Sequence, residues 1–292
     1  MNYRHAYHAG NFADVLKHTV LLALIEALQA KPTPFAFVDT HAGSGCYALD
    51  GTEAGKTGEY KDGIARLLFP DLHAGGAPAQ PLPPLLRRWL DAILRLPGNE
   101  HGLRLYPGSP LQVANAMREG DSAQLCELHP EEATRLRELF HHDHRVHVHE
   151  RNGYEALKAL LPPKEKRGLV LIDPPFEEQG EFPRLVEGLQ KAYRRWPGGI
   201  YALWYPIKDR KAVNGFRAAL KEAGIPKILD IAFDIRPVSN EPSLDGSGLV
   251  LVNPPYTLEG ELRVLLPALH RLLAVGQPSR WTLDWLAGEY AD

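Results

Sequence analysis

One short stretch of this chain, Gly168 to Phe176, constrains the fold more than any other. It reads Gly-Leu-Val-Leu-Ile-Asp-Pro-Pro-Phe, an apolar run that stops at a carboxylate, two prolines and an aromatic ring. Such a run is typical of a strand buried on both faces of a parallel sheet, and prolines end a strand because they lack backbone donors. The pattern predicts Asp173 and Phe176 at the carboxyl edge of an α/β sheet, where ligands bind. A plain strand-ending turn is the alternative.

Length and composition exclude several classes of protein. A chain of 292 residues can form one large α/β domain, or a domain with an insert, with a core that needs no disulfide bonds. Its two cysteines, Cys46 and Cys126, argue against a disulfide framework and for a reducing compartment. The sequence has neither the apolar core of a signal peptide nor a membrane-spanning stretch, so we expect a cytoplasmic protein. A net charge of -3 means that any nucleic acid would meet a local basic patch.

The order of expected elements indicates a mostly parallel sheet. Helical periodicity alternates with short apolar runs along the chain until two runs follow each other, which favours an antiparallel hairpin at one edge. We therefore predict an α/β, Rossmann-like fold with a seven-stranded sheet. The expected strands are 35–38, 122–128, 145–150, 168–172, 199–205, 227–235 and 248–252, and the main expected helices are 13–28, 85–96, 111–118, 131–140, 182–196 and 209–223.

Composition changes in the first half of the chain, where residues 70–84 are rich in proline, alanine and glycine. A short helix carrying three arginines follows this linker. We predict a helical insertion subdomain over 47–105 and a catalytic domain formed by 1–46 and 106–292, with a polar amino-terminal arm. Ser109 is expected to cap the helix that follows the insertion.

Polar residues recur where the expected strands end. Asp39 precedes a glycine turn at Gly43, which lets a ligand approach the backbone closely. Gly43, Gly45 and Ala48 also fit a dinucleotide-binding spacing, but no clean helix follows, which disfavours a nicotinamide cofactor. An acid at a strand end, such as Glu127, can accept both ribose hydroxyls.

Taken together, these motifs resemble a known family. The chain is similar to Rossmann-like S-adenosylmethionine-dependent amino-methyltransferases with a (Asp/Asn/Ser)-Pro-Pro-(Tyr/Phe/Trp) motif. Among these it most resembles the bacterial 23S ribosomal RNA adenine-N6 methyltransferases of the RlmJ type. The matching segments keep their order along most of the chain and lie at 3–5, 8–11, 13–19, 39–43, 106–110, 127–130, 171–175 and 200–206.

The resemblance implies S-adenosylmethionine as cofactor and 23S ribosomal RNA as partner. It implies a cofactor site in which Lys17 meets the cofactor carboxylate and the other residues surround the methionine, ribose and adenine. The implied cofactor-binding residues are Lys17, His18, Asp39, His41, Gly43, Ser109, Glu127, Asn152, Gly153 and Asp173. The arm would close over cofactor or base, with Tyr3, His5, Asn11 and Phe176 as substrate-binding residues. The family often has an acid at the position of Asn152 and usually a tyrosine at that of Phe176.

The implied chemistry is consistent with the residues of the opening motif. Adenine N6 is a poor nucleophile because its lone pair is delocalised into the ring. Asp173 and the backbone carbonyl of Pro174 can accept hydrogen bonds from both N6 protons and so direct the lone pair at the methyl group. Phe176 would stack on the flipped base, a contact of ~1 to 3 kcal/mol. We therefore predict Asp173, Pro174 and Phe176 as the catalytic residues.

Several alternatives remain open at this point. A second motif, Asn253-Pro254-Pro255-Tyr256, has the same pattern but comes too late in the strand order. The same fold could methylate DNA adenine or a protein amide, or retain only RNA binding without catalysis. The histidines between 141 and 149 match no metal-ligand spacing, so we expect no metal, and we expect a monomer. The basic segments 164–167, 194–195 and 208–211 are solvated faces or a shared phosphate-contacting surface.

Overall fold

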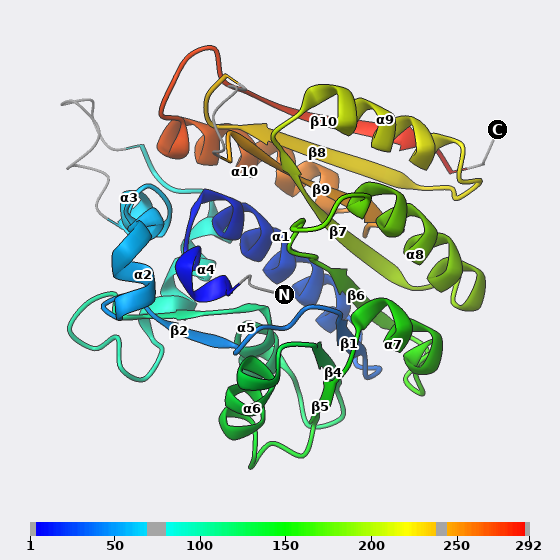
Figure 1. Ribbon diagram of the computed structural model, residues 1–292, viewed down its shortest axis with the longest axis horizontal. Coiled ribbons are helices and arrows are strands. Elements are labelled where there is room, and N and C mark those ends of the chain that lie inside the picture. Colours follow the sequence, from blue (N-terminus) through cyan, green and yellow to red (C-terminus); the bar gives the residue numbers. More distant parts are fainter. Residues whose placement is uncertain (1–3, 69–79, 238–243, 290–292) are drawn as a thin grey trace.

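The computed structural model describes residues 4–68, 80–237 and 244–289, which are built around one eight-stranded sheet (Figure 1). The strand order is β10-β8-β9-β7-β6-β1-β4-β5. Neighbouring strands from β7 to β5 pair in parallel, whereas β9 pairs antiparallel with β7 and β8, and β10 with β8. These strands are β1 Ala36–Asp39, β4 Ser122–Glu127, β5 Val146–Glu150, β6 Gly168–Ile172, β7 Ile200–Ile207, β8 Ile228–Asp234, β9 Gly246–Val252 and β10 Arg280–Ala287.

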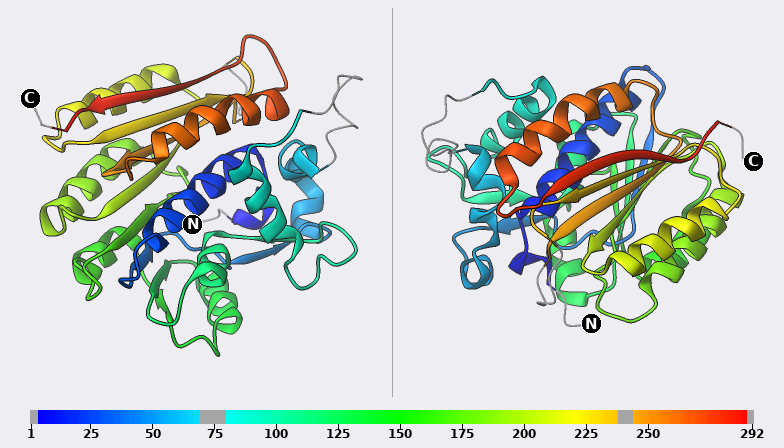
Figure 2. Two further views of the ribbon diagram at one scale, coloured as in Figure 1. Left: turned by 180° about the vertical axis from the view of Figure 1, so that it is seen from behind. Right: turned by 90° about the horizontal axis from the view of Figure 1, so that it is seen from above.

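Helices cover both faces of the sheet (Figure 2). Buried side chains of α1, α5, α6 and α10 share one core cluster, and those of α7, α8 and α9 share the other. The helices are α1 Phe12–Gln29, α2 Thr52–Thr57, α3 Ile64–Leu68, α4 Pro84–Leu94, α5 Ser109–Ala116, α6 Pro130–Leu139, α7 Gly153–Leu160, α8 Glu181–Arg195, α9 Arg210–Lys221 and α10 Leu258–Leu273. Two 3-10 turns, η1 His5–Tyr7 and η2 Glu59–Lys61, and a two-stranded sheet of β2 Cys46–Ala48 and β3 Leu105–Pro107 complete the described elements.

Strand β6 shows why the opening motif is apolar throughout. Leu169 and Leu171 point into the α1 cluster, whereas Val170 and Ile172 point into the opposite one. Both faces of a central parallel strand are covered by helices, so every residue of β6 is buried. The strand ends at Ile172, and the prolines that follow Asp173 keep the chain from continuing the ladder.

The expected α/β class is confirmed, but the expected count of seven strands is wrong. Residues 280–287 add an eighth strand, which pairs with β8, so the β8–β9 hairpin is not the sheet edge. Helix α10 is a further element beyond those expected, although Leu258, Leu262 and Leu269 repeat with helical spacing and are buried. Segment 52–57, expected to be no clean helix, forms the short α2.

The described residues between 47 and 105 form helices α2 to α4 next to the β2–β3 pair. Their buried side chains, including Ile64 and Trp89, belong to the same core cluster as Leu16 and Leu24 of α1. The division of the chain into a catalytic domain and an insertion subdomain stays a prediction. Across the described ranges, we find no helix that is long and apolar enough to cross a membrane.

Candidate active site

A cavity of about 700 Å³ opens at the carboxyl edge of β1, β4, β6 and β7. The part of the chain that the structure describes brings nearly all predicted site residues to this cavity. Those lining it are His5, Asn11, Lys17, His18, His41, Gly43, Ser109, Glu127, Asn152, Gly153, Asp173, Pro174 and Phe176. Asp39 lies directly behind Ser109, and Tyr3 falls outside the described residues.

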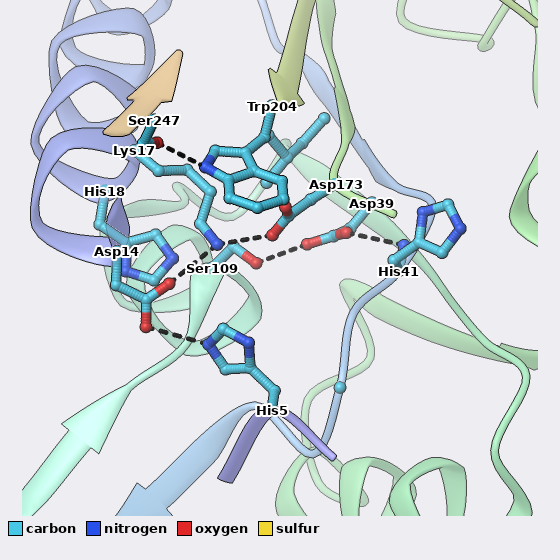
Figure 3. A network of polar contacts seen from close by, with 12 residues as sticks. His5, Asp14, Lys17, His18, Asp39, His41, Ser109, Asp173, Trp204 and Ser247 are labelled. Atoms are coloured by element: carbon cyan, nitrogen blue, oxygen red, sulfur yellow. Dashed lines mark hydrogen bonds and ion pairs between the residues drawn. The ribbon is translucent and has the colours of Figure 1, made fainter. Parts of the chain in front are cut away.

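A buried ion-pair chain connects helix α1 to the end of β6 (Figure 3). Lys17 Nζ lies 2.5 Å from Asp173 Oδ2 and 2.9 Å from Asp14 Oδ1. The other Asp14 oxygen lies 2.9 Å from His5 Nε2 and accepts the backbone N–H of Gly10 at 3.0 Å. Asp14 therefore joins the amino-terminal arm to the lysine that contacts Asp173. In this structure the Lys17 ammonium is held by two side-chain carboxylates.

Burial and neighbouring charges determine which of these ion-paired side chains are protonated. Burial alone would lower the pKa of Lys17, but Asp14 and Asp173 raise it well above its ordinary value, so the amine stays charged. Burial alone would raise the pKa of Asp14, yet His5, Lys17 and His18 hold it well below its ordinary value. Burial lowers the pKa of His18 to about 3, so its imidazole is neutral at pH 7. His18 Nδ1 lies 2.7 Å from the hydroxyl of Tyr106.

Asp39 ends strand β1 and is fully buried. Its carboxylate accepts the Ser109 hydroxyl at 2.7 Å and the backbone N–H of His41 at 3.1 Å. Burial raises the pKa of Asp39 to about 7, against the opposing effect of these two hydrogen bonds. The expectation that Ser109 caps the following helix is wrong: Gly108 is the N-cap of α5, and the Ser109 hydroxyl turns to Asp39 instead.

Glu127 ends strand β4, and its side chain stabilises the glycine turn by hydrogen bonding. Its two oxygens accept the backbone N–H groups of Gly43 at 2.8 Å and His129 at 2.7 Å. Gly43 has a φ of 61°, the left-handed region that favours glycine. Burial raises the pKa of Glu127, and the backbone donors lower it only in part. A carboxylate has about four lone-pair positions, so Glu127 can still accept hydroxyl groups from a ligand.

Asn152 and Gly153 lie at the start of helix α7, after β5. The Asn152 side-chain oxygen accepts the N–H groups of Tyr154 and Glu155 and so caps the helix, leaving the side-chain nitrogen without a partner among the described residues. A Cβ added at Gly153 would lie 2.1 Å from the carbonyl oxygen of Thr40. The close approach of α7 to the end of β1 therefore requires glycine at this position.

Aromatic rings form the wall beside Asp173. The ring of Phe176 lies 5.0 Å from that of Phe182 and 5.8 Å from that of Trp204, both edge-on. The Trp204 indole donates to the Ser247 hydroxyl at 2.8 Å, which fixes its orientation (Figure 3). Phe176 has a φ of 53°, which is uncommon for a bulky residue and turns the chain sharply after the two prolines.

The described part of the arm lies against the cavity. His5 contacts Asp14, and its ring lies 5.0 Å from that of Tyr47. The Asn11 side chain caps helix α1 by accepting the N–H of Asp14, and its amide nitrogen donates to Glu59 at 3.0 Å. His5 and Asn11, the two predicted substrate-binding residues in the described part of the arm, therefore line the cavity and also hold the arm in place.

Sequence reasoning gave no role to Asp14 or Tyr154, which both line the cavity. Asp14 precedes Lys17 by three residues on one helix, a spacing that could have indicated the pair. The hydroxyl of Tyr154 donates to Glu181 at 2.9 Å, and its ring packs edge-on to His41 at 5.5 Å. Tyr154 has no comparable signal because Glu181 is distant in the sequence.

The second Pro-Pro motif lies elsewhere. Strand β9 runs antiparallel to β7, so Asn253 follows it at the amino edge of the parallel strands. Its amide donates to the carbonyls of Pro197 and Gly199, both at 2.8 Å, and it does not line the cavity. Tyr256 is 96% exposed. Nor do the described residues contain a cluster of three or more histidine, cysteine or acidic side chains placed to hold a metal ion.

The donor set of the cavity fits a cationic, ribose-containing cofactor together with a base. The carboxylates of Glu127 and Asp173 line the cavity and are available to hydroxyl and amino groups, Asp39 lies directly behind Ser109, and the glycine turn exposes backbone to a ligand. The volume of about 700 Å³ lies within the range for ligand pockets, roughly 300–1,000 Å³.

Comparison with known proteins agrees with this geometry. The family described as "Ribosomal RNA large subunit methyltransferase D, RlmJ" matches residues 32–287. Ribosomal RNA large subunit methyltransferase J of Haemophilus influenzae is 41% identical over 99% of this chain and 100% of its own length, and that of Escherichia coli is 42% identical over the same shares. A crystal structure of a Legionella pneumophila protein is 35% identical and superposes with a TM-score of 0.84, covering 95% of this chain and 98% of that chain. The chain belongs to the RlmJ family of ribosomal RNA large subunit methyltransferases.

Proposed function

We propose that this protein transfers a methyl group from S-adenosylmethionine to the exocyclic N6 of an adenosine in 23S ribosomal RNA. The observation that carries the proposal is the position of Asp173. Its carboxylate, at the end of β6, lies in one cavity with Ser109, Glu127 and Asn152 from three neighbouring elements. The names of the full-length relatives supply the class of RNA. A ribosomal RNA substrate also implies a cytoplasmic enzyme.

The residues that would hold the cofactor follow from their chemistry. Asp39, with a pKa near 7, can pair with an ammonium group, and Glu127 can accept ribose hydroxyls through its remaining lone pairs. Asn152 can offer its amide nitrogen to an adenine edge. The role of Lys17 is less direct than the sequence suggests, because its ammonium is already paired with Asp14 and Asp173. When bound, S-adenosylmethionine supplies the electrophilic methyl group.

The residues of the DPPF motif would activate the amino group. The Asp173 carboxylate and the Pro174 carbonyl are both acceptors, so together they can accept hydrogen bonds from the two N6–H groups and favour a pyramidal nitrogen. Lys17 offsets the charge of Asp173 in the buried site. Phe176, braced by Phe182 and Trp204, offers one ring face to the base.

A transfer assay tests the proposal. The purified protein is incubated with methyl-labelled S-adenosylmethionine and an unmodified in vitro transcript of 23S ribosomal RNA, and the product is digested to nucleosides. We expect the label in N6-methyladenosine. Label in another nucleoside, or transfer only to DNA or to protein, would replace the proposal with another methyltransferase activity of the same fold.

Cofactor binding without transfer would indicate an RNA-binding protein that has lost catalysis. Protection against thermal unfolding distinguishes the cofactors, because a ligand that binds the native state raises the melting temperature. We expect S-adenosylhomocysteine to protect and NAD not to protect. Protection by NAD alone would favour an oxidoreductase instead.

A further inference from the structure

Both acidic and basic side chains line the cavity. Glu177 and Glu178 follow the DPPF motif, and Arg184 is paired with Glu178 at 2.6 Å and with Glu181 at 3.3 Å. Lys208 and Arg236 line the cavity where β7 and β8 end. A polyanion that delivers a base to Asp173 would avoid the glutamates and meet Lys208 and Arg236.

Two further arginines lie at the same sheet edge as Lys208 and Arg236 and line a small separate pocket. Arg210 begins helix α9 and Arg280 begins β10. Because Arg280 is in register with Asp234, Asp234 with Gly246, and Gly246 with Ile207, these strand ends form one row across four strands. Three interstrand spacings of about 4.8 Å give this row a length of roughly 14 Å. We call Lys208, Arg210, Arg236 and Arg280 the basic ledge.

Buried carboxylates hold the arginines of the basic ledge in position. Arg210 and Arg280 both point at Asp234 Oδ2, at 2.7 and 3.4 Å, and Arg236 Nε lies 3.1 Å from Asp245 Oδ1. Both aspartates are buried, whereas the arginine side chains are 42 to 65% exposed. A guanidinium has five N–H donors in a rigid fork, so one edge can be held while the other faces solvent.

The basic ledge keeps a net positive charge. Its four cations face two buried carboxylates, and within the described ranges Lys208 has no ion pair. Asp209 lies between Lys208 and Arg210 and caps helix α9, with Lys211 beside it to offset its charge. Deeper in the sheet, Arg217 is paired with Asp230 and adds no charge to the surface.

The other basic segments of the sequence do not share this surface. Residues 164–167 precede β6 and residues 194–195 end α8, so both lie at the amino edge of the parallel strands. There Arg167 donates to the carbonyls of Thr33 and Leu28, and Arg195 to that of Leu161. Of the two alternatives for these segments and 208–211, solvated faces or one shared surface, the shared surface is therefore wrong, because the fold separates them.

We propose that the basic ledge binds backbone phosphates of the RNA strand that carries the target adenosine. Guanidinium groups preorganised by buried aspartates match phosphate geometry, and Lys208 and Arg236 of the ledge line the cavity that contains Asp173. This inference rests on the proposed function, since it assigns the path by which the RNA substrate enters the same site. It predicts that binding at the ledge is electrostatic and independent of base sequence.

The test compares two doubly substituted proteins that lose the same charge. Lys208→Gln/Arg280→Gln removes two cations of the ledge, and Lys164→Gln/Arg194→Gln removes two exposed cations of the opposite edge. Affinity for an unmodified in vitro transcript of 23S ribosomal RNA is measured from about 50 to 200 mM salt, a range in which phosphate contacts dominate. Protection by S-adenosylhomocysteine checks that each variant keeps its fold and cofactor site.

We expect the slope of log affinity against log salt to become shallower by about 1.4 for the ledge variant, at about 0.7 for each lost single-strand contact. The control variant should keep the wild-type slope. If Arg280→Gln disturbs the sheet, Lys208→Gln alone should give about half the change. Equal slopes for ledge and control variants would overturn the proposal.

Binding is measured without methyl transfer, so the ledge and the proposed chemistry can fail separately. A protein that transfers no methyl group but loses RNA affinity in the ledge variant would contradict only the proposed function. Loss of binding to ribosomal particles with unchanged binding to naked transcript would instead assign the ledge to a protein partner and contradict the RNA assignment.

Discussion

Two segments with the same pattern, Asp173 to Phe176 and Asn253 to Tyr256, adopt opposite roles in this molecule. Each follows an apolar, fully buried strand, and each contains a residue with a φ of 53°, Phe176 in the first and Asn253 in the second. The first lies at the carboxyl edge of the parallel strands and lines the cavity. The second follows an antiparallel strand and lies at the opposite edge.

The difference shows that strand direction decides what such a motif can do. The Asp173 carboxylate lies in a cavity and contacts Lys17, whereas the Asn253 amide nitrogen donates both of its hydrogens to backbone carbonyls. Phe176 packs on Trp204, but Tyr256 is almost fully exposed. A Pro-Pro motif therefore becomes a candidate site only where neighbouring strands bring ligand-binding groups to the same edge.

The largest expected effect on stability concerns the backbone at the site edge. Gly153→Ala places a Cβ 2.1 Å from a backbone oxygen, so we expect a loss of about 3 kcal/mol in the free energy of unfolding. Gly198→Ala, at the opposite edge, meets no atom within 4 Å and should leave stability close to wild type. Urea denaturation measures both, and equal midpoints would contradict the close packing of α7 on β1.

The aromatic positions of the two motifs should differ in catalysis. Removing a stacked ring costs about 2 kcal/mol, so Phe176→Ala should lower kcat/KM for RNA roughly 30-fold. Phe176→Tyr keeps the ring face and should restore most of the activity. Tyr256→Ala is the matched control, and a comparable loss there would remove the distinction between the motifs.

Asn253, the polar residue of the second motif, should contribute to stability and not to catalysis. Asn253→Ala leaves the carbonyls of Pro197 and Gly199 without their donor, which should lower the free energy of unfolding by about 1.5 kcal/mol. Methyl transfer by this variant should be unchanged at temperatures where it is folded. Calorimetry and a transfer assay on the same preparation check both expectations.

The smallest effect is a pH dependence of cofactor binding. Burial raises the pKa of Asp39 to about 7, so its carboxyl is largely protonated below that pH in the free protein. A ligand ammonium favours the ionised form and lowers this pKa, so the affinity for S-adenosylhomocysteine should rise with pH up to about 7 and then level off. Because binding is linked to the loss of one proton, the affinity can rise by at most about tenfold per pH unit. Titration calorimetry should show the slope in the wild type and its loss in Asp39→Asn.

The sequence was sufficient to predict the features that depend on local pattern. Strand β6 and its terminal Asp173 follow from an apolar run and two prolines, and the position of the cavity follows from the polar ends of parallel strands. Strand β10 was missed because its residues are half-buried or exposed and form no apolar run. Strands β2 and β3 are three residues each, too short to show a period.

Side-chain partners were the least predictable part of the site. Lys17 was expected to meet a cofactor carboxylate, and the structure instead pairs it with Asp14 and Asp173, the second of which lies 156 positions away in sequence. Ser109 was expected to cap a helix and bonds to Asp39 instead. The partner of a polar side chain depends on which groups the fold buries together. The spacing of residues along one helix or strand does not reveal this partner.

Single-turnover methyl transfer by Asp173→Ala and Asn253→Ala tests the central claim most directly. Both proteins are compared with wild type at saturating S-adenosylmethionine and unmodified 23S ribosomal RNA, with N6-methyladenosine measured after digestion. We expect Asp173→Ala to lose roughly 10²- to 10³-fold in rate, as when a preorganised polar group is removed from an active site. Asn253→Ala should transfer at the wild-type rate. A wild-type rate in Asp173→Ala, or a comparable loss in Asn253→Ala, would contradict the assignment of the chemistry to the carboxyl edge of β6.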